Sequence, residues 1–353
     1  MKVLDLFCGC GGLILGFEQA GFEIIGGIDI NPDAIATFQL NFPHAAAIQG
    51  DLEMLSIEAI QEHIPHLAKV EVLIGGPPCQ GFSSANRWTH ESEDVRNRLF
   101  FEFVALADYI QPKAILIENV RGIITKDNGY AKDRIYQIFQ ERGYNVCHRV
   151  LNASHYGVPQ NRHRNFFVMT KKSDFNFDTL VESESTPTVG EALREMYVFE
   201  SATETDTHVF ANPATTDYQR YLRASDNRIR NHEIRYPAQI VQERIGHVPQ
   251  GDNWRAVPTE LWPTQRNNRH SSAYRRLHEE RPSVTIDTGN THSNYFHPTF
   301  NRLPSPREAA RLQSFPDSFF FTGTRSPQYI QVGNAVPPLL AKAIAKALLE
   351  ALQ

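Results

Sequence analysis

The amino-acid sequence predicts an α/β protein, with a mostly parallel β-sheet covered by helices on both faces and a second, loop-rich unit. Three observations support this prediction. Short β-rich runs alternate with helical patterns over the first 170 residues, which favours right-handed crossovers between parallel strands. After Lys172 the periodicity weakens, and Pro, Asn and His become frequent. The 353 residues are 41% apolar and 21% charged, which is enough apolar material for a packed core.

Six strands are predicted from runs of apolar and β-branched residues, at 3–7, 23–28, 70–74, 114–117, 145–151 and 165–170, with a further short strand ahead of residue 51. Helices fill the gaps. The first ends near Gly21, and the second has Asn31 as its cap and Pro32 at its first position. A third stops at Pro112 and a fourth ends near Gly143, while "PPLLAKAIAKALLEALQ" predicts a final amphipathic helix.

The charge of the chain varies strongly along its length. The net charge is −5, so a polyanion site has to be local. Residues 173–210 hold nine acidic residues and one arginine, whereas residues 215–281 hold twelve arginines, eight acidic residues and no lysine. Arginine reads guanine edges with two parallel hydrogen bonds, so this segment favours sequence recognition in nucleic acid. The alternative is a solvated surface that pairs with local acids. The acidic stretch would repel a nucleic acid, so we expect it to lie away from one.

The sequence predicts a cytoplasmic protein. Its first residues lack the pattern of a signal peptide, and no run of eighteen apolar residues predicts a membrane span. The four cysteines are too few for a disulfide framework in a chain of this length. Cys8 and Cys10 are spaced poorly for zinc, so we expect no metal and free thiols.

A glycine-rich turn, "DLFCGCGGLILGF", follows the first predicted strand and opens a helix. Its glycines let the backbone approach a ligand closely. Asp29 lies twenty residues past Gly9, at the end of the second strand, where a carboxylate can accept the hydroxyls of a ribose. The pattern lacks the third glycine of a dinucleotide site, so a nucleoside without phosphates fits better. Asp51 could accept the amine of an adenine. A simple glycine turn and a capping aspartate remain the alternatives.

Cys79 stands at the end of an apolar run, in "LIGGPPCQGF". The carboxyl ends of strands are where open α/β sheets bind ligands. The two prolines before Cys79 would restrict how far its sulfur can move. A free thiol is mostly protonated at neutral pH, so a nucleophilic role requires a lowered pKa or a nearby base. A buried apolar cysteine is the alternative.

Glu118 follows four apolar residues, and burial at that strand end would raise its pKa and let it donate a proton. Arg162 and Arg164, in "QNRHR", are two residues apart, which places them on one side of an extended segment. Two adjacent guanidiniums suit a carboxylate, a carbonyl or a phosphate. The alternatives are a solvated glutamate and a surface arginine pair.

Six motifs occur in a fixed order: DLFCGCGG, GGPPCQGFS, ENV, QNRHR, RLPSPREAARLQSFPDSF and QVGNAVPP. In this order the chain resembles the bacterial cytosine-5 DNA methyltransferases, over nearly its whole length except residues 173–270. The resemblance implies a Rossmann-like, doubly wound catalytic domain of the class I methyltransferase type, which binds S-adenosyl-L-methionine. It would comprise residues 1–175 and 326–353, with a smaller target-recognition domain at 176–325.

The resemblance also implies the site residues. Cys79 would be the nucleophile, with Gln80 and Ser83 in a mobile catalytic loop, and the target base would be held by Glu118, Arg162 and Arg164. The positions matching the cofactor contacts are Phe7, Cys10, Gly12, Asp29, Ile30, Asp51, Leu52, Pro78, Leu99, Asn334 and Val336. Many relatives carry glutamate where this chain has Asp29, and the shorter side chain should still reach a ribose.

The activity so implied is methyl transfer to C5 of a flipped-out cytosine in a specific double-stranded DNA sequence, through a covalent cysteine–C6 intermediate. The expected context is a monomer that acts on DNA as the modification half of a restriction-modification system, with a cognate endonuclease. A tRNA cytosine-5 methyltransferase is one alternative. Amino-methylating enzymes are another, but they carry Pro-Pro-Tyr or Pro-Pro-Trp where this chain has Pro-Pro-Cys. A non-catalytic, S-adenosylmethionine-sensing DNA-binding protein is a third, and it would not need both Cys79 and Glu118.

Overall fold

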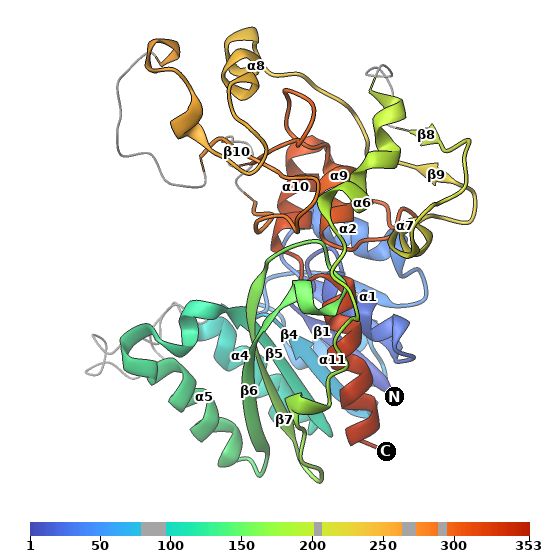
Figure 1. Cartoon of the computed structure of the whole chain (residues 1–353). Coiled ribbons are helices and arrows are strands. Elements are labelled where there is room, and N and C mark those ends of the chain that lie inside the picture. Colours follow the sequence, from blue (N-terminus) through green and yellow to red (C-terminus); the bar gives the residue numbers. More distant parts are fainter. Residues whose placement is uncertain (79–96, 201–206, 263–272, 289–294) are drawn as a thin grey trace. The chain divides into compact units, whose positions relative to one another are not determined.

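A computed structural model describes residues 1–78, 97–200, 207–262, 273–288 and 295–353 (Figure 1). By their internal contacts these residues form two compact units. The first comprises residues 1–156, 163–182 and 336–353, and the second comprises residues 157–162 and 183–335.

The first unit contains a seven-stranded sheet with the order β3-β2-β1-β4-β5-β7-β6. Five neighbouring strands are parallel: β1 (Lys2–Leu6), β2 (Glu23–Asp29), β3 (Ala46–Gln49), β4 (Val72–Gly75) and β5 (Ala114–Val120). The last two, β6 (Asn145–Asn152) and β7 (His163–Thr170), add an antiparallel edge. The prediction of a mostly parallel α/β sheet of the Rossmann type is confirmed.

Helices cover this sheet, and their apolar residues build its core. They are α1 (Gly12–Gln19), α2 (Pro32–Asn41), α3 (Ile57–His63), α4 (Arg98–Ile110), α5 (Tyr130–Gln140) and α11 (Pro338–Ala351). One large apolar cluster joins α3, α4 and α5 to alternate strand residues such as Leu4, Ile117 and Phe167. Side chains alternate between the faces of a strand, so Asp5 of β1 projects to the face opposite this cluster.

Helices α1 and α11 lie against each other in the first unit (Figure 1). The contact is close because α1 carries a glycine there. A Cβ atom added to Gly16 would lie 2.4 Å from the Cβ of Ala341 and 2.5 Å from the backbone nitrogen of Lys342. No larger residue fits at Gly16 unless the two helices separate.

The predicted helix signals act as expected. The side chain of Asn31 accepts a hydrogen bond of 3.0 Å from the backbone nitrogen of Ala34, with Pro32 at the first helical position. Gly21 and Gly143 follow α1 and α5 with φ values of 95° and 79°, which favour glycine. The chief difference lies in β5, which continues to Val120 instead of ending at residue 117. Pairing with β7 extends β5 to Val120, so Glu118 lies within the strand.

The second unit is rich in loops, as predicted. Its helices are α6 (Val189–Leu193), α7 (Asp217–Leu222), α8 (Gln239–Gly246), α9 (Pro306–Leu312) and α10 (Arg325–Asn334). Two small ribbons complete it: β8 (His208–Val209) with β9 (Arg228–Ile229), and β10 (Arg275–Arg276) with β11 (Tyr295–Phe296).

Buried ion pairs form much of the core of this unit, around α9. Arg302 donates to both Glu308 and Glu200, with shortest distances of 2.7 Å to each. Arg311 donates to Asp317 and, at 2.6 Å, to Glu195. Such pairs are costly to break once buried, because the remaining charge has no water to solvate it.

Among the described residues, one segment is long and apolar enough for a membrane span by composition, residues 325–351. It consists of two helices, α10 and α11, with a break between Asn334 and Pro338. Most of it is buried inside the protein, which is typical of the core helices of a globular fold.

Candidate active site

The glycine-rich turn after β1 is held by Asp29, at the end of β2. The backbone nitrogen of Gly9 donates to Oδ2 of Asp29, and that of Asn31 donates to Oδ1, both at 2.8 Å. Gly9 has a φ of +52°, and a Cβ atom added to it would meet nothing within 4 Å. The turn therefore leaves open space beside a carboxylate whose orientation is fixed.

The rest of the turn is tightly packed. Gly11 has a φ of +101°, and a Cβ there would lie 2.5 Å from the ring of Phe42. The backbone nitrogens of Phe7 and Cys8 both donate to the carbonyl of Ile28, at 2.9 and 3.0 Å. These contacts join the carboxyl ends of β1 and β2, so the open space at Gly9 is part of a rigid frame.

Residues at the ends of three adjacent strands surround this frame. Strands β1, β2 and β3 are parallel neighbours, so the residues that follow them emerge at the same edge of the sheet. The apolar side chain of Ile30 is 63% exposed there. The backbone nitrogen of Gly50 donates to the carbonyl of Asp29, and the carboxylate of Asp51 accepts from the backbone of Glu53 at 3.0 Å. An exposed aliphatic surface between two carboxylates suits a nucleoside.

The other residues predicted to bind the cofactor differ in their surroundings. Burial raises the pKa of the Cys10 thiol to about 12, and Gly12 is the first residue of α1. Leu52 and Val336 are buried, Leu99 and Pro78 are partly buried, and Asn334 is exposed. All except Asn334 belong to the first unit.

Asp5, in the middle of β1, is a site residue that the sequence reasoning missed. It is 1% exposed, and its carboxylate oxygens have no hydrogen-bond partner among the described residues. Burial, with repulsion from Asp29 and Glu118, raises the pKa of Asp5 well above its usual range. The signal was present in the sequence, as a carboxylate between apolar residues in "VLDLF".

Glu118 and Arg164 form an ion pair on β5 and β7. Glu118 lies opposite Phe166 in the antiparallel register, and Arg164 lies opposite Val120. Both side chains therefore project from the same face of the sheet. The Nε atom of Arg164 lies 2.9 Å from Oε1 of Glu118, and the two side chains are only 18% and 16% exposed.

The start of the segment that leads to Cys79 lies beside this pair. A Cβ atom on Gly76 would lie 3.2 Å from Oε2 of Glu118, so only glycine fits there without displacing the carboxylate. The side-chain amide of Asn119 donates to the carbonyl of Pro77 at 3.1 Å. Cys79 itself, with Gln80 and Ser83, lies outside the described residues.

The three described cysteines are poor candidates for a nucleophile. Burial raises the pKa of the Cys8 thiol well above its usual value, that of Cys10 to about 12 and that of Cys147 to about 11. Their thiols are therefore protonated at neutral pH, and the thiolate is the reactive form.

Arg162 does not lie beside Arg164 as the period-two spacing predicted. The backbone nitrogen of Arg162 donates to the carbonyl of Gln160, so the chain turns there and becomes extended only from His163. The guanidinium of Arg162 is fully buried and donates to the carbonyls of Ile286, at 2.7 Å, and Gly333, at 2.6 Å. Arg162 thus binds Ile286 and the end of α10 within the second unit, and of these two arginines it is Arg164 that pairs with Glu118.

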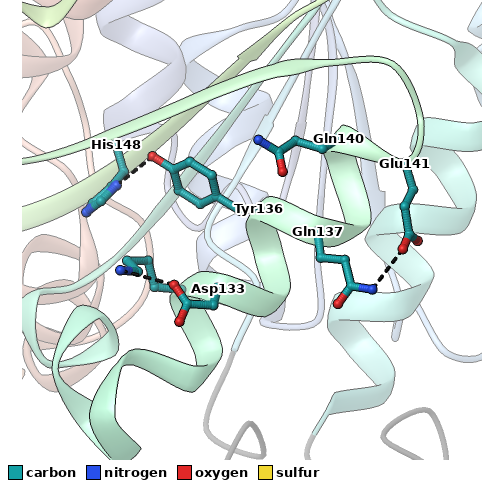
Figure 2. A pocket seen from close by; sticks show the side chains of 7 residues that line it. Asp133, Tyr136, Gln137, Gln140, Glu141 and His148 are labelled. Atoms are coloured by element: carbon teal, nitrogen blue, oxygen red, sulfur yellow. Dashed lines mark hydrogen bonds and ion pairs between the residues drawn. The ribbon is translucent and has the colours of Figure 1, made fainter.

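A pocket of about 430 Å³ opens on the outer side of α5 and β6 (Figure 2). The hydroxyl of Tyr136 lies 2.8 Å from Nδ1 of His148 at this pocket. The residues that line the pocket are Lys132, Asp133, Tyr136, Gln137, Gln140, Glu141 and His148. None of the predicted site residues lines it, so we do not assign it to the active site.

The chain is similar to known DNA methyltransferases. The chain is 38% identical to the type II methyltransferase M1.HphI of Haemophilus parahaemolyticus, over 99% of this chain and 87% of that protein. It is 35% identical to the type II methyltransferase M.DdeI of Desulfomicrobium norvegicum, over 98% and 88%. A crystal structure of a candidate DNA modification methyltransferase encoded within an E. coli prophage matches with a TM-score of 0.80 and 28% identity, and covers 100% of this chain and 99% of that one.

A family model supplies the assignment. The model for C-5 cytosine-specific DNA methylases matches residues 1–350. The chain therefore belongs to the C-5 cytosine-specific DNA methylases, which use S-adenosyl-L-methionine as the methyl donor.

Proposed function

We propose that this protein methylates cytosine within one specific double-stranded DNA sequence, through a covalent bond between Cys79 and C6 of a cytosine rotated out of the duplex. The observation that carries this proposal is the Glu118–Arg164 pair on strands β5 and β7. Gly76 and Pro77, at the start of the segment that leads to Cys79, contact the same strand end. An acid, a guanidinium and a thiol are the groups that the reaction needs.

The chemistry explains each group. C5 of cytosine is a weak nucleophile, and attack of a thiolate on C6 converts C5 into the nucleophilic carbon of an enamine. Electron density moves toward N3 and the carbonyl oxygen during the attack. Glu118 donates a proton to N3, and Arg164 stabilises the carbonyl oxygen.

The second half of the reaction restores the aromatic ring. S-Adenosyl-L-methionine, when bound, supplies an electrophilic methyl group for C5. A base then removes the C5 proton, the electrons of that C–H bond re-form the C5–C6 double bond, and the sulfur of Cys79 leaves as a thiolate. Glu118 takes back the proton from N3, so the enzyme returns to its starting state.

Arg164 forms an ion pair with Glu118 as well. A guanidinium 2.9 Å away stabilises the ionised carboxylate, whereas proton donation needs the neutral acid. We infer that the carbonyl oxygen of the incoming cytosine draws Arg164 away from Glu118. Glu118 can then hold a proton for N3.

The residues at the glycine turn fit S-adenosylmethionine. Asp29 would accept the ribose hydroxyls, Ile30 would cover one face of the adenine, and Asp51 would accept its amine. Gly9 leaves the space that the ligand needs, and Asp5 offers an unpartnered buried acid beside it. The remaining proposed contacts are Phe7, Cys10, Gly12, Leu52, Pro78, Leu99, Asn334 and Val336.

The DNA is proposed to be a duplex, with recognition in residues 176–325. Rotating the cytosine out of the stack costs a few kcal/mol, which protein contacts have to offset. The names of the relatives favour a role as the modification enzyme of a restriction-modification system. We therefore propose a cytoplasmic monomer associated with the nucleoid and accompanied by an endonuclease for the same site.

The decisive experiment replaces Cys79. Cys79→Ser should abolish methyl transfer while DNA and cofactor binding stay close to wild type, because serine lacks a nucleophilic thiolate. Wild-type protein should form a covalent adduct, visible in a denaturing gel, with a duplex that contains 5-fluorocytosine, since fluorine does not leave as a proton does. An active Cys79→Ser variant, or no adduct, would refute the covalent mechanism. Methylation of tRNA in preference to duplex DNA would refute the proposed substrate.

A further inference from the structure

We propose that Arg255 and Arg275 read guanine bases of the target sequence in the DNA major groove. This inference rests on the proposed function, since it concerns the recognition part of the same enzyme. Residues 215–281 contain twelve arginines. Those whose guanidiniums have no protein partner are available to bind DNA.

Most of the described arginines in this segment already have protein partners. Five form ion pairs with nearby carboxylates, namely Arg220 with Asp217, Arg223 with Glu195, Arg228 and Arg230 with Asp226, and Arg235 with Glu233. Two others, Arg266 and Arg269, lie outside the described residues. These pairs agree with the alternative raised from the sequence, a surface on which arginines neutralise local acids.

Arg244 and Arg276 hold neighbouring backbone segments in place through hydrogen bonds to carbonyl oxygens. Arg276 donates to the carbonyls of Pro298 and Thr299 at 2.8 and 2.7 Å, and to two carbonyls at the end of α8 and just beyond it at 3.2 Å. Arg244 donates twice to the carbonyl of Leu261 and lies 4.7 Å from the ring of Trp262. Both guanidiniums hold loops around a small apolar core of Ile245, Val248, Val257, Tyr274 and Phe296.

Arg275 projects from the other side of the same strand. It neighbours Arg276 in β10, and consecutive residues of a strand face opposite ways. Arg276 and Tyr274 turn toward the apolar core, so Arg275 turns away from it. Its guanidinium has no hydrogen bond or ion pair among the residues that the structure describes.

Arg255 lies on the backbone segment that is bonded to β10. The backbone nitrogen of Trp254 donates to the carbonyl of Ala273, and that of Arg276 donates to the carbonyl of Asp252, at 3.2 and 3.0 Å. Arg255 is exposed, and its guanidinium lies 5.6 Å from the ring of Trp254, with no carboxylate partner in the described part of the chain. Two available guanidiniums are therefore carried on one hydrogen-bonded scaffold.

Their surroundings strengthen the assignment. The sequences on either side of this scaffold that the structure does not describe, 263–272 and 289–294, contain no Asp or Glu that could pair with either arginine. Arg281 also has no partner among the described residues, but Glu279 and Glu280 precede it directly. Such acids would repel a phosphate backbone, so we leave Arg281 out of the proposal.

The chemistry points to guanine. A guanidinium donates two parallel hydrogen bonds to O6 and N7 of guanine, and this pairing discriminates between bases. Lysine offers a similar charge without the planar pair of donors. A base contact therefore requires the arginine fork, whereas a phosphate contact requires mainly its charge.

The experiment first maps the sequence that the wild-type protein methylates, using a library of duplexes with random bases around a cytosine. It then repeats the map with Arg255→Lys, Arg275→Lys, Arg275→Ala and the control Arg235→Ala. Arg235 belongs to the same unit and already pairs with Glu233 at 2.6 Å. Each lysine variant should lose discrimination for guanine at one position by about ten-fold or more, with the other positions unchanged. The control should keep the wild-type map.

Three results would overturn the inference. One is an unchanged map in all variants. Another is a loss of binding to every sequence in Arg275→Ala that is restored in Arg275→Lys, with a fall of about 0.9 in the slope of log K against log salt concentration. Such a result would mark a phosphate contact. The third is loss of preference at a base other than guanine. If wild-type protein methylates no duplex in the library, the proposed function itself fails, so the two failures can be distinguished.

Discussion

Arg164 forms an ion pair with Glu118, with 2.9 Å between Nε and Oε1, across two strands that run in opposite directions, at the end of β5 and the start of β7. The two residues come from motifs 46 positions apart in the chain, and only the antiparallel pairing of β7 brings them together. The acid and the guanidinium proposed to bind the target base are therefore paired with each other.

Replacing Glu118 by glutamine tests the acid. Glu118→Gln keeps the size of the side chain and can still donate a hydrogen bond, but it cannot transfer a proton. We expect kcat for methyl transfer to fall by about 10²- to 10⁴-fold, with DNA affinity close to wild type. Single-turnover transfer of labelled methyl groups measures this. Glu62→Gln, an exposed glutamate on α3, is the control, and a near-normal rate for Glu118→Gln would disprove proton donation.

The two arginines of "QNRHR" should separate into different roles. Arg162 is buried and bonded to two carbonyls, so Arg162→Lys should lower the melting temperature by several degrees, because buried groups lose their partners. Arg164→Lys should leave the melting temperature nearly unchanged but lower kcat, since lysine cannot bind the carbonyl oxygen with the same geometry. Thermal unfolding and the rate of methyl transfer, measured for both variants, test whether the two arginines have these different roles. Equal effects on stability from both variants would contradict it.

The space at Gly9 gives a test for the cofactor. In Gly9→Ala the new methyl group would enter space that meets no protein atom within 4 Å, so the fold should persist while the affinity for S-adenosylmethionine falls. Gly21→Ala is a matched control, because Gly21 also has a positive φ and equally open surroundings at the end of α1. Calorimetric titration should show weaker cofactor binding for Gly9→Ala only. Equal affinity in both variants would place the ligand elsewhere.

The second unit should lose stability in mild acid. Burial lowers the pKa of both His232 and His297 from 6.5 to about 3, against the attraction of Glu308. Arg302 also opposes the charging of both imidazoles. Because the folded pKa is the lower one, the stabilisation is complete above pH 6.5 and decreases as the unfolded chain takes up protons. Each histidine should reduce the free energy of unfolding by about 1.4 kcal/mol per pH unit below 6.5.

Urea unfolding at pH 7.5, 6.5 and 5.5 measures this decrease. His232→Gln should make the pH dependence shallower, even though the variant starts from a lower stability. His66→Gln, at an exposed position in the first unit, should keep the wild-type slope. Stability that does not change between pH 7.5 and 5.5 would show that these imidazoles are not held neutral by the fold. Glu308, whose pKa is held far below its usual range by Arg302, stabilises the fold throughout this pH range, and that stabilisation is lost only at more acidic pH, below its unfolded pKa of 4.5.

The sequence predicted elements best where the signals were local. The Asn31 cap, the proline that follows it and the glycine after α1 act within a few residues, and each has the predicted role. The extension of β5 to Val120 could not be predicted in this way, because β7 begins more than 40 residues later. Asp29 was placed correctly at the end of β2, but its bonds to Gly9 and Asn31 depend on the three-dimensional turn.

The buried arginines were harder to predict. The spacing in "QNRHR" indicated an extended pair, but the partners of Arg162 are carbonyls 124 and 171 positions further along the chain. Arg311 likewise looks like a surface residue of a short helix, yet its partners include Glu195, 116 positions earlier. A side chain with charge is normally assigned to the surface, and only the folded chain supplies the distant groups that make its burial stable.

The close contact between Gly16 and Ala341 has a consequence for how the protein is made. Helix α1 can be covered by α11 only after residue 351 has left the ribosome, when every residue of the second unit has already been synthesised. The nascent chain must therefore keep one apolar side of its first helix exposed, or shielded by a chaperone, until α11 has been synthesised.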